Sequence, residues 1–95
     1  MPVTYFRVRW PDQTESNCYS PSSVVTDYFA EGQDYPLEEF MRRVRLALGE
    51  ASERVRAKYG YACTAAMAEL EALENTALRW RDDSGASVRW IGFAR

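Results

Sequence analysis

The chain contains no histidine, only one lysine and two cysteines. Without an imidazole, neither a Ser-His-Asp nor a Cys-His catalytic arrangement can be built, and nearly every mononuclear zinc enzyme is excluded. Cys18 and Cys63 alone cannot complete a structural zinc site. We therefore expect no catalytic residue of the usual kinds, no metal and no cofactor, and we favour a protein that is not an enzyme.

Long apolar runs and a surplus of positive charge are also missing. No uncharged apolar stretch is long enough to span a bilayer, and the first residues lack the charged head and apolar core of a signal peptide. The net charge of −2 gives no basic excess of the kind that nucleic-acid binders carry. We expect a cytoplasmic bacterial protein, with reduced cysteines, that binds neither nucleic acid nor a membrane.

The chain does have the material for one hydrophobic core. Hydrophobic residues make up 46% of its 95 residues and aromatic residues 14%, which suits a single domain covering residues 1–95. Eleven of its twelve basic residues are arginine. Because arginine forms planar, two-pronged pairs with carboxylates, this excess indicates ion-pair networks or an interface. A genome rich in G and C explains the excess equally well.

Residues 3–10 alternate between apolar and polar side chains, which predicts a half-buried strand. Pro11 and Asp12 are typical of a turn. Residues 15–19 are then predicted as the returning, edge strand of a hairpin. The first strand places Phe6, Val8 and Trp10 on one face and Tyr5, Arg7 and Arg9 on the other.

Ser20 and Pro21 form a helix-start signal, a capping serine followed by a proline in the first turn. We therefore predict a short helix over residues 21–29. Residues 30–34, which include a glycine and an aspartate, are predicted as a loop.

Apolar residues at three- and four-residue spacing predict a long second helix from Pro36 to Tyr59. Gly60 is a suitable C-terminal stop for it. A third helix with the same spacing is predicted from residue 63 or 64 to Trp80.

Residues 87–93 are apolar and rich in strand-forming types, and we predict a final strand there. The order of elements is then β-β-α-α-α-β. This order predicts an α+β fold, in which a small antiparallel sheet, made of the N-terminal hairpin and the C-terminal strand, packs on three helices.

The last strand carries bulky apolar residues on both faces. Strict alternation places Val88 and Trp90 on one face and Ile91 and Phe93 on the other. A single layer of helices covers only one face of a sheet. We therefore predict a homodimer, formed on the sheet side that carries Tyr5 and one of these two apolar pairs. The alternative is a strand enclosed within one chain, with the first helix crossing to the other face.

Several stretches of the sequence resemble a known bacterial family. They are Phe6–Asp12, Glu15, Cys18–Ser22, Asp27–Phe29, Ala51–Arg56, Lys58–Gly60 and Ala62–Cys63. The chain resembles the small nitrogen starvation response proteins that are encoded beside a nitrilase, a radical SAM protein, an acetyltransferase-like protein and a flavoprotein.

The resemblance implies a role linked to nitrile or cyanide assimilation. It transfers no catalytic residue, and the C-terminal third of the chain resembles the family less closely. The first turn reads Asp12-Gln13 here, where the family has Asp-Gly.

Cys18 and Cys63 lie in the stretches that resemble the family. One of them is a candidate nucleophile or redox sensor, if Arg54, Arg56 or Lys58 stabilises its thiolate. The alternative, which we favour, is a pair of small buried residues, because free cysteine is among the most often buried types.

Arg7 and Arg9 share one strand face and are candidates to bind an anion or an acidic partner. The alternative, which we favour, is a solvated face with cross-strand pairs to Glu15 or Asn17. Asp27 is a further candidate ligand, on the short first helix.

Two functions remain open from the sequence. We favour a non-enzymatic accessory or interaction protein in a nitrogen-starvation, nitrilase-linked pathway, with partners among the proteins of that pathway. The alternative is a small module that binds an anion or a nitrile-derived ligand, or that depends on a cysteine for catalysis.

Overall fold

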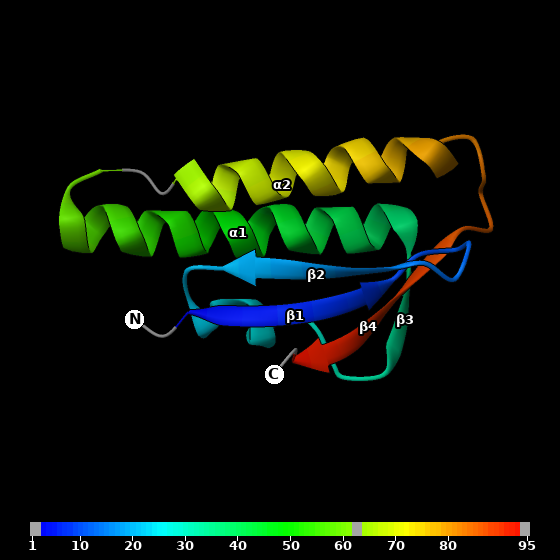
Figure 1. Ribbon diagram of the computed structural model, residues 1–95, viewed down its shortest axis with the longest axis horizontal. Helices are drawn as coiled ribbons and strands as arrows, with labels where there is room; N and C mark the ends of the chain where they lie inside the picture. Colours follow the sequence, from blue (N-terminus) through cyan, green and yellow to red (C-terminus); the bar gives the residue numbers. More distant parts are fainter. Residues whose placement is uncertain (1–2, 62–63, 94–95) are drawn as a thin grey trace.

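The computed structural model describes residues 3–61 and 64–93. Two α-helices lie side by side along one side of a four-stranded antiparallel sheet (Figure 1). The α+β class is therefore confirmed. The elements are β1 (Thr4–Arg9), β2 (Glu15–Ser20), the 3-10 helix η1 (Ser23–Asp27), β3 (Gln33–Pro36), α1 (Leu37–Tyr59), α2 (Thr64–Ala77), the 3-10 helix η2 (Leu78–Trp80) and β4 (Ser87–Phe93).

The strands follow the spatial order β2-β1-β4-β3, so that β1 and β4 are central and β2 and β3 are edges. The predicted hairpin is confirmed, with Tyr5 directly opposite Tyr19. The predicted final strand is also confirmed, and it pairs antiparallel with β1. The first and last strands of the chain therefore pair with each other in the centre of the sheet. The fold depends on this contact between residues that are far apart in the sequence.

Strand β3 was not predicted, since its residues overlap the predicted loop at 30–34. Its four residues pair with the start of β4, and the buried Tyr35 lies opposite Val88. Pro36 ends the strand at the edge of the sheet, where a missing N–H is tolerated. A strand this short has no readable alternation, so only its partner defines it.

The predicted first helix was wrong in type and in its cap. A 3-10 turn, η1, replaces it, and Ser22 caps this turn by accepting the N–H of Val24 at 3.3 Å. The hydroxyl of Ser20 instead donates to the carbonyl of Ser22 at 2.7 Å. The predicted order β-β-α-α-α-β is therefore corrected to two α-helices and four strands.

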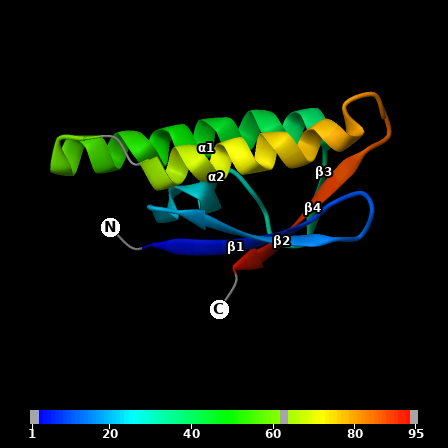
Figure 2. The same cartoon turned by 45° about the horizontal axis from the view of Figure 1, so that its top comes forward.

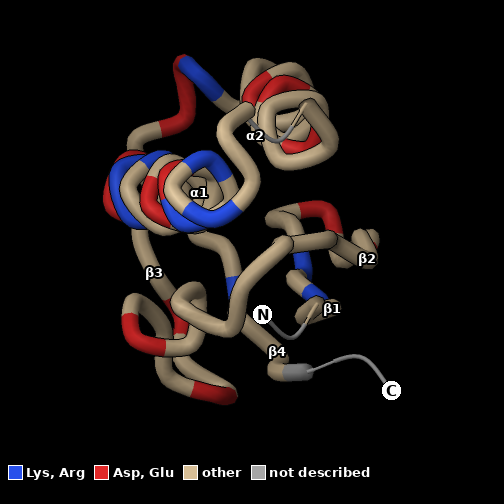
Figure 3. Tube along the Cα trace, turned by 90° about the vertical axis from the view of Figure 1, so that its left-hand side faces the viewer, with Lys and Arg blue, Asp and Glu red and all other residues tan. Residues whose placement is uncertain are grey.

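The two long helices are confirmed, except that α2 ends at Ala77 and the 3-10 helix η2 takes the last three residues predicted for it. Gly60 ends α1 in the left-handed conformation, at φ 84°, and its N–H bonds to the carbonyl of Arg56 at 2.8 Å. Ion pairing between Arg45 and Glu74 at 2.9 Å joins α1 to α2. Figure 3 shows basic and acidic residues along α1, whereas α2 carries acidic residues only.

In the part of the chain that the structure describes, neither helix has the length and apolar character needed to cross a membrane.

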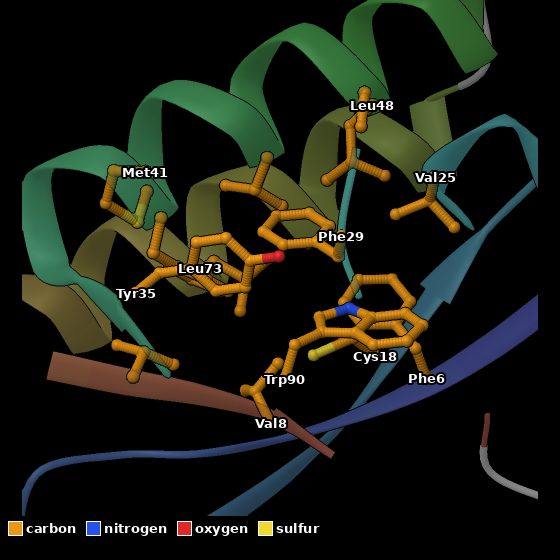
Figure 4. Packing of buried hydrophobic residues seen from close by; sticks show 14 of the residues in the cluster. Phe6, Val8, Cys18, Val25, Phe29, Tyr35, Met41, Leu48, Leu73 and Trp90 are labelled. Carbon is orange, nitrogen blue, oxygen red and sulfur yellow. The ribbon is translucent and has the colours of Figure 1, made fainter. Parts of the chain in front are cut away.

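Aromatic rings fill the space between the sheet and α1. Trp10 stacks on Trp80 with ring centroids 5.7 Å apart, and Phe29 stacks on Trp90 at 5.8 Å. Such pairs contribute about 0.5–1.5 kcal/mol each beyond the burial of their area. Figure 4 shows Phe29 and Trp90 within the same cluster as Cys18. The apolar face predicted for β1 is therefore the core face.

Alternation along β4 holds only as far as Trp90. Val88 and Trp90, one of the two pairs of apolar residues that were predicted to share a face, are both buried. Val8 then pairs with Trp90 but Arg7 with Gly92, so Ile91 is an extra residue in a β-bulge. Gly92 has φ 140°, and a side chain there would meet Glu31 at 3.2 Å. The bulge therefore ends the predicted alternation at Ile91, and the side chain of Phe93 lies outside the described part of the chain.

Candidate functional site

Among residues 3–61 and 64–93, no helix packs against one face of the sheet. The helices and η1 all lie on the other side (Figure 2). On the uncovered side, called here the open face, the outward positions of the strands carry mostly polar and aromatic side chains. They are Tyr5, Arg7, Arg9, Glu15, Asn17, Tyr19, Asp34 and Arg89.

A row of four charged residues crosses the open face, one from each strand. The strand register places them in the order Glu15, Arg9, Arg89 and Asp34. Arg9 donates from Nε and Nη2 to Glu15, at 3.1 and 2.8 Å. Arg89 donates from Nε and Nη2 to the two oxygens of Asp34, at 2.8 and 3.1 Å. Each of the two arginines on the central strands is thus paired with a carboxylate on the neighbouring edge strand.

Hydrogen bonds from Arg89 lower the pKa of the Asp34 carboxyl. The same bonds, and the charge of Asp34, raise the pKa of the Arg89 guanidinium. Both groups are therefore charged across the physiological pH range. This end of the row is a fixed ion pair.

The rest of the open face continues the hairpin pairing. Arg7 donates from Nε to the side-chain oxygen of Asn17 at 3.0 Å, with Glu15 at 3.9 Å. The predicted cross-strand pairs of Arg7 and Arg9 are therefore formed. Tyr5 and Tyr19 are in edge-to-face contact at 5.8 Å. Tyr5 is 54% exposed, so an aromatic surface lies beside the arginines.

A crevice of about 400 Å³ opens alongside the charged row, and Arg9, Arg89 and Asp34 of that row line it. It lies between the β1–β2 turn, at Pro11 and Gln13, and the segment 83–87 that leads into β4. The crevice is therefore lined by two segments that are far apart in the sequence, each of which carries one arginine of a central strand.

The β1–β2 turn forms one wall of this crevice. The N–H of Gln13 bonds to the carbonyl of Trp10 at 2.9 Å, and the N–H of Trp10 bonds to Thr14 at 2.8 Å. Gln13 has φ 73°, the left-handed conformation that this type of hairpin turn requires and that glycine adopts most easily. Asp12 accepts from the N–H and hydroxyl of Thr14, and the hydroxyl bond is the main cause of its lowered pKa.

Cys18 lies on the core face of β2 and is buried. Burial raises the pKa of its thiol to about 12, and the charge of Glu69 contributes in the same direction. A thiol with this pKa stays protonated at neutral pH and is a poor nucleophile. Cys63 lies outside the described residues.

The remaining predicted site residues lie on other surfaces. Arg54 pairs with Glu50 at 3.6 Å, and Arg56 pairs with Glu53 at 3.5 Å, all on the exposed side of α1. Asp27 is exposed at the end of η1. The structure therefore brings Arg7 and Arg9 together and places Arg54, Arg56 and Asp27 elsewhere. Within the described residues, no group of three or more His, Cys, Asp or Glu could hold a metal ion.

Sequence reasoning missed Arg89, Asp34 and Asp83 as residues of this site. A signal for Arg89 was present, because it alternates with the buried Val88 and Trp90 and so shares a face with Arg9. Asp34 could not be found without β3. Asp83 lines the crevice only because the loop before β4 passes beside it in the folded structure.

These features define a small α+β protein with two helices on one face of a four-stranded sheet and a charged, aromatic opposite face. The chain belongs to the family of the nitrogen starvation-induced protein NitG, whose family model matches residues 5–93. The family resemblance read from the sequence is therefore confirmed. No curated protein and no solved structure shows a significant match to the chain.

Proposed function

We propose that this nitrogen starvation-induced protein is a non-enzymatic accessory protein that binds a protein of a nitrilase-linked pathway through its open face. The observation that carries the proposal is the ordered row of charges across all four strands beside an exposed tyrosine. The buried, protonated Cys18 supports it as well, since this thiol is no ready nucleophile.

The open face has the composition of a binding surface. Arginine and tyrosine are enriched among the residues that contribute most binding energy in protein interfaces. Arg9 and Arg89 are already held by Glu15 and Asp34, so less side-chain entropy is lost when a partner binds. Exposed Tyr5 adds apolar area at a small entropic cost.

Growth and co-purification test this proposal together. A deletion strain is complemented with wild-type protein or with the double variant Tyr5→Ala, Arg7→Ala, and grown with a nitrile as the sole nitrogen source. The control is Tyr59→Ala, Arg42→Ala, because Tyr59 is also 54% exposed and Arg42 is also an exposed, ion-paired arginine.

We expect the wild type and the control to restore growth and to recover an enzyme of the nitrilase pathway from nitrogen-starved cells. The open-face variant should do neither while remaining folded by circular dichroism. Recovery of no pathway enzyme by the wild type, at native expression, contradicts the proposal. An equal loss of growth and of enzyme recovery in both double variants contradicts the proposal that the partner binds the open face.

We also propose that the open face, when no pathway protein is bound to it, pairs with the same face of a second copy in a homodimer. Tyr5 and Tyr19 form its most aromatic part, on neighbouring strands. A twofold axis near these residues would bring the same aromatic surface of two copies together, and twofold pairs are the commonest symmetric assemblies.

A further inference from the structure

We propose that the crevice alongside the charged row binds a small zwitterion of the α-amino acid type. Its carboxylate would lie against Arg9 and Arg89, and its ammonium group against Asp83. This ligand site goes beyond the accessory role proposed above and does not depend on it, because the two are tested by different measurements.

The crevice exists because two central strands separate there. Arg9 and Arg89 are the last paired residues of β1 and β4 at this end. Beyond them β1 passes into the hairpin turn at Trp10 and Pro11, while β4 arrives from the segment 83–87. The space between the two paths is lined mainly by polar groups, including the Gln13 amide and the Ser87 hydroxyl.

The carboxylate end of the proposed ligand meets two guanidinium groups. Arg9 and Arg89 lie directly opposite each other, an arrangement that is unfavourable for like charges unless other charges compensate it. Glu15 and Asp34 compensate from the outside and use the Nε and Nη2 atoms. A guanidinium has five N–H donors, so each arginine keeps donors beyond those that bond to Glu15 or Asp34. A carboxylate is the group that such planar donors bind best.

The ammonium end meets a carboxylate without an ion pair. Asp83 accepts a hydrogen bond from the N–H of Gly85 at 3.0 Å. Among the described residues, no lysine or arginine forms a salt bridge with it. A primary ammonium group would provide that missing cation.

The charge balance of the lining selects a zwitterion over a simple ion. In the lining, Arg9 and Arg89 bring two positive charges and Asp34 and Asp83 bring two negative charges, while Glu15 pairs with Arg9 from outside the crevice. A bare anion would be repelled by both aspartates, and a bare cation by both arginines. A ligand with both signs pairs each end with its opposite, and a volume of about 400 Å³ suits a small amino acid.

Titration followed by NMR tests the proposal. The ¹⁵N-labelled protein is titrated with each of the common α-amino acids in turn, and the amide signals of Gly85, Ser87 and Arg89 are followed. The best binder is then compared with its N-acetyl derivative, which has no ammonium group, and with its carboxamide, which has no carboxylate.

We expect saturable shifts at these amides, and affinity at least about tenfold weaker for both derivatives. Asp83→Asn should weaken binding of the amino acid about tenfold. It should not weaken binding of the N-acetyl derivative, because the anionic derivative loses a repelling charge. Arg89→Gln should weaken both. Arg42→Gln is the control, since it breaks a similar exposed ion pair on α1 and should change nothing.

Three results would overturn the proposal. One is the absence of saturable shifts for every amino acid at roughly 10 mM. Another is equal affinity for the N-acetyl derivative, which would make the crevice a simple anion site. The third is unchanged binding in a folded Asp83→Asn protein. Asp83 is exposed and lies in a loop, so this variant is expected to fold.

Discussion

The carboxylate of Glu69 on α2 accepts a hydrogen bond from the backbone N–H of Tyr19 on β2 at 2.5 Å. Strand β2 is an edge of the sheet, and edge strands expose backbone groups that invite pairing with other chains. Glu69 satisfies one of these groups from a helix 50 positions later in the sequence. The bond therefore fastens α2 to the sheet and blocks part of its free edge.

Replacing Glu69 by alanine should lower the free energy of unfolding by about 1–2 kcal/mol, because the N–H of Tyr19 loses its charged acceptor. Urea unfolding measures the change. Glu71→Ala is the control, since Glu71 is exposed on the same helix and should change stability little. An equal effect of both substitutions would show that the loss comes from helix charge and not from the bond.

The buried thiol of Cys18 predicts a loss of stability at alkaline pH. Burial and Glu69 raise the thiol pKa from 9.0 to about 12 in the folded protein. The unfolded chain therefore releases this proton at a lower pH than the folded chain does. Stability should fall as pH rises from about 9 towards 12, by up to about 1.4 kcal/mol for each pH unit.

Unfolding measured against pH in the wild type and in Cys18→Ala isolates this contribution. The variant is less stable at neutral pH, but its stability should fall less between pH 9 and 12 than that of the wild type. Parallel curves would mean that the Cys18 thiol is not shielded. Iodoacetamide labelling, resolved by mass spectrometry, should likewise modify Cys18 only as fast as the protein unfolds.

Gly49 in α1 and Gly60 at its C-terminal cap should respond in opposite directions to the same change. A side chain at Gly49 meets no atom within 4 Å, so Gly49→Ala should raise the free energy of unfolding by about 1 kcal/mol. Gly60 also has open space but a φ of 84°, so Gly60→Ala should lower it by about 1 kcal/mol. Thermal or urea unfolding measures the change in the free energy of unfolding for both variants. Changes of the same sign would contradict the helix boundary.

The backbone conformation of Gln13 predicts that replacing it by glycine stabilises the hairpin turn. Its φ of 73° is costly for a residue with a side chain, so Gln13→Gly should raise the free energy of unfolding by up to about 1 kcal/mol. Gln33→Gly, in β3, is the control and should be destabilising. A loss of stability in Gln13→Gly would show that the glutamine side chain contributes more than the strain costs.

The proposed homodimer predicts a mass in solution of twice the 10.9 kDa of one chain. Light scattering at micromolar concentration measures it. Tyr5→Lys should shift the protein towards monomer, because it places a charge in the proposed contact, whereas Tyr59→Lys on α1 should not. A mass near 10.9 kDa that is independent of concentration would contradict the dimer.

The sequence by itself determined the elements whose signals are local. The alternation of residues 3–10 and the spacing of apolar residues between Pro36 and Tyr59 define β1 and α1. The same alternation placed Arg7 and Arg9 on one face, where the structure has them. These predictions hold because the signal repeats within the element and needs no distant partner.

Tertiary structure alone decided the features that depend on contacts between distant residues. The four residues of β3 become a strand only because β4 pairs with them, and Asp34 meets Arg89 across 55 positions of the chain. The bulge at Ile91 follows from how β4 fits against β1, and it ends the alternation that the sequence predicted. The crevice between the β1–β2 turn and segment 83–87 likewise exists only once β1 and β4 pair and then separate, because no local pattern records where two distant strands part.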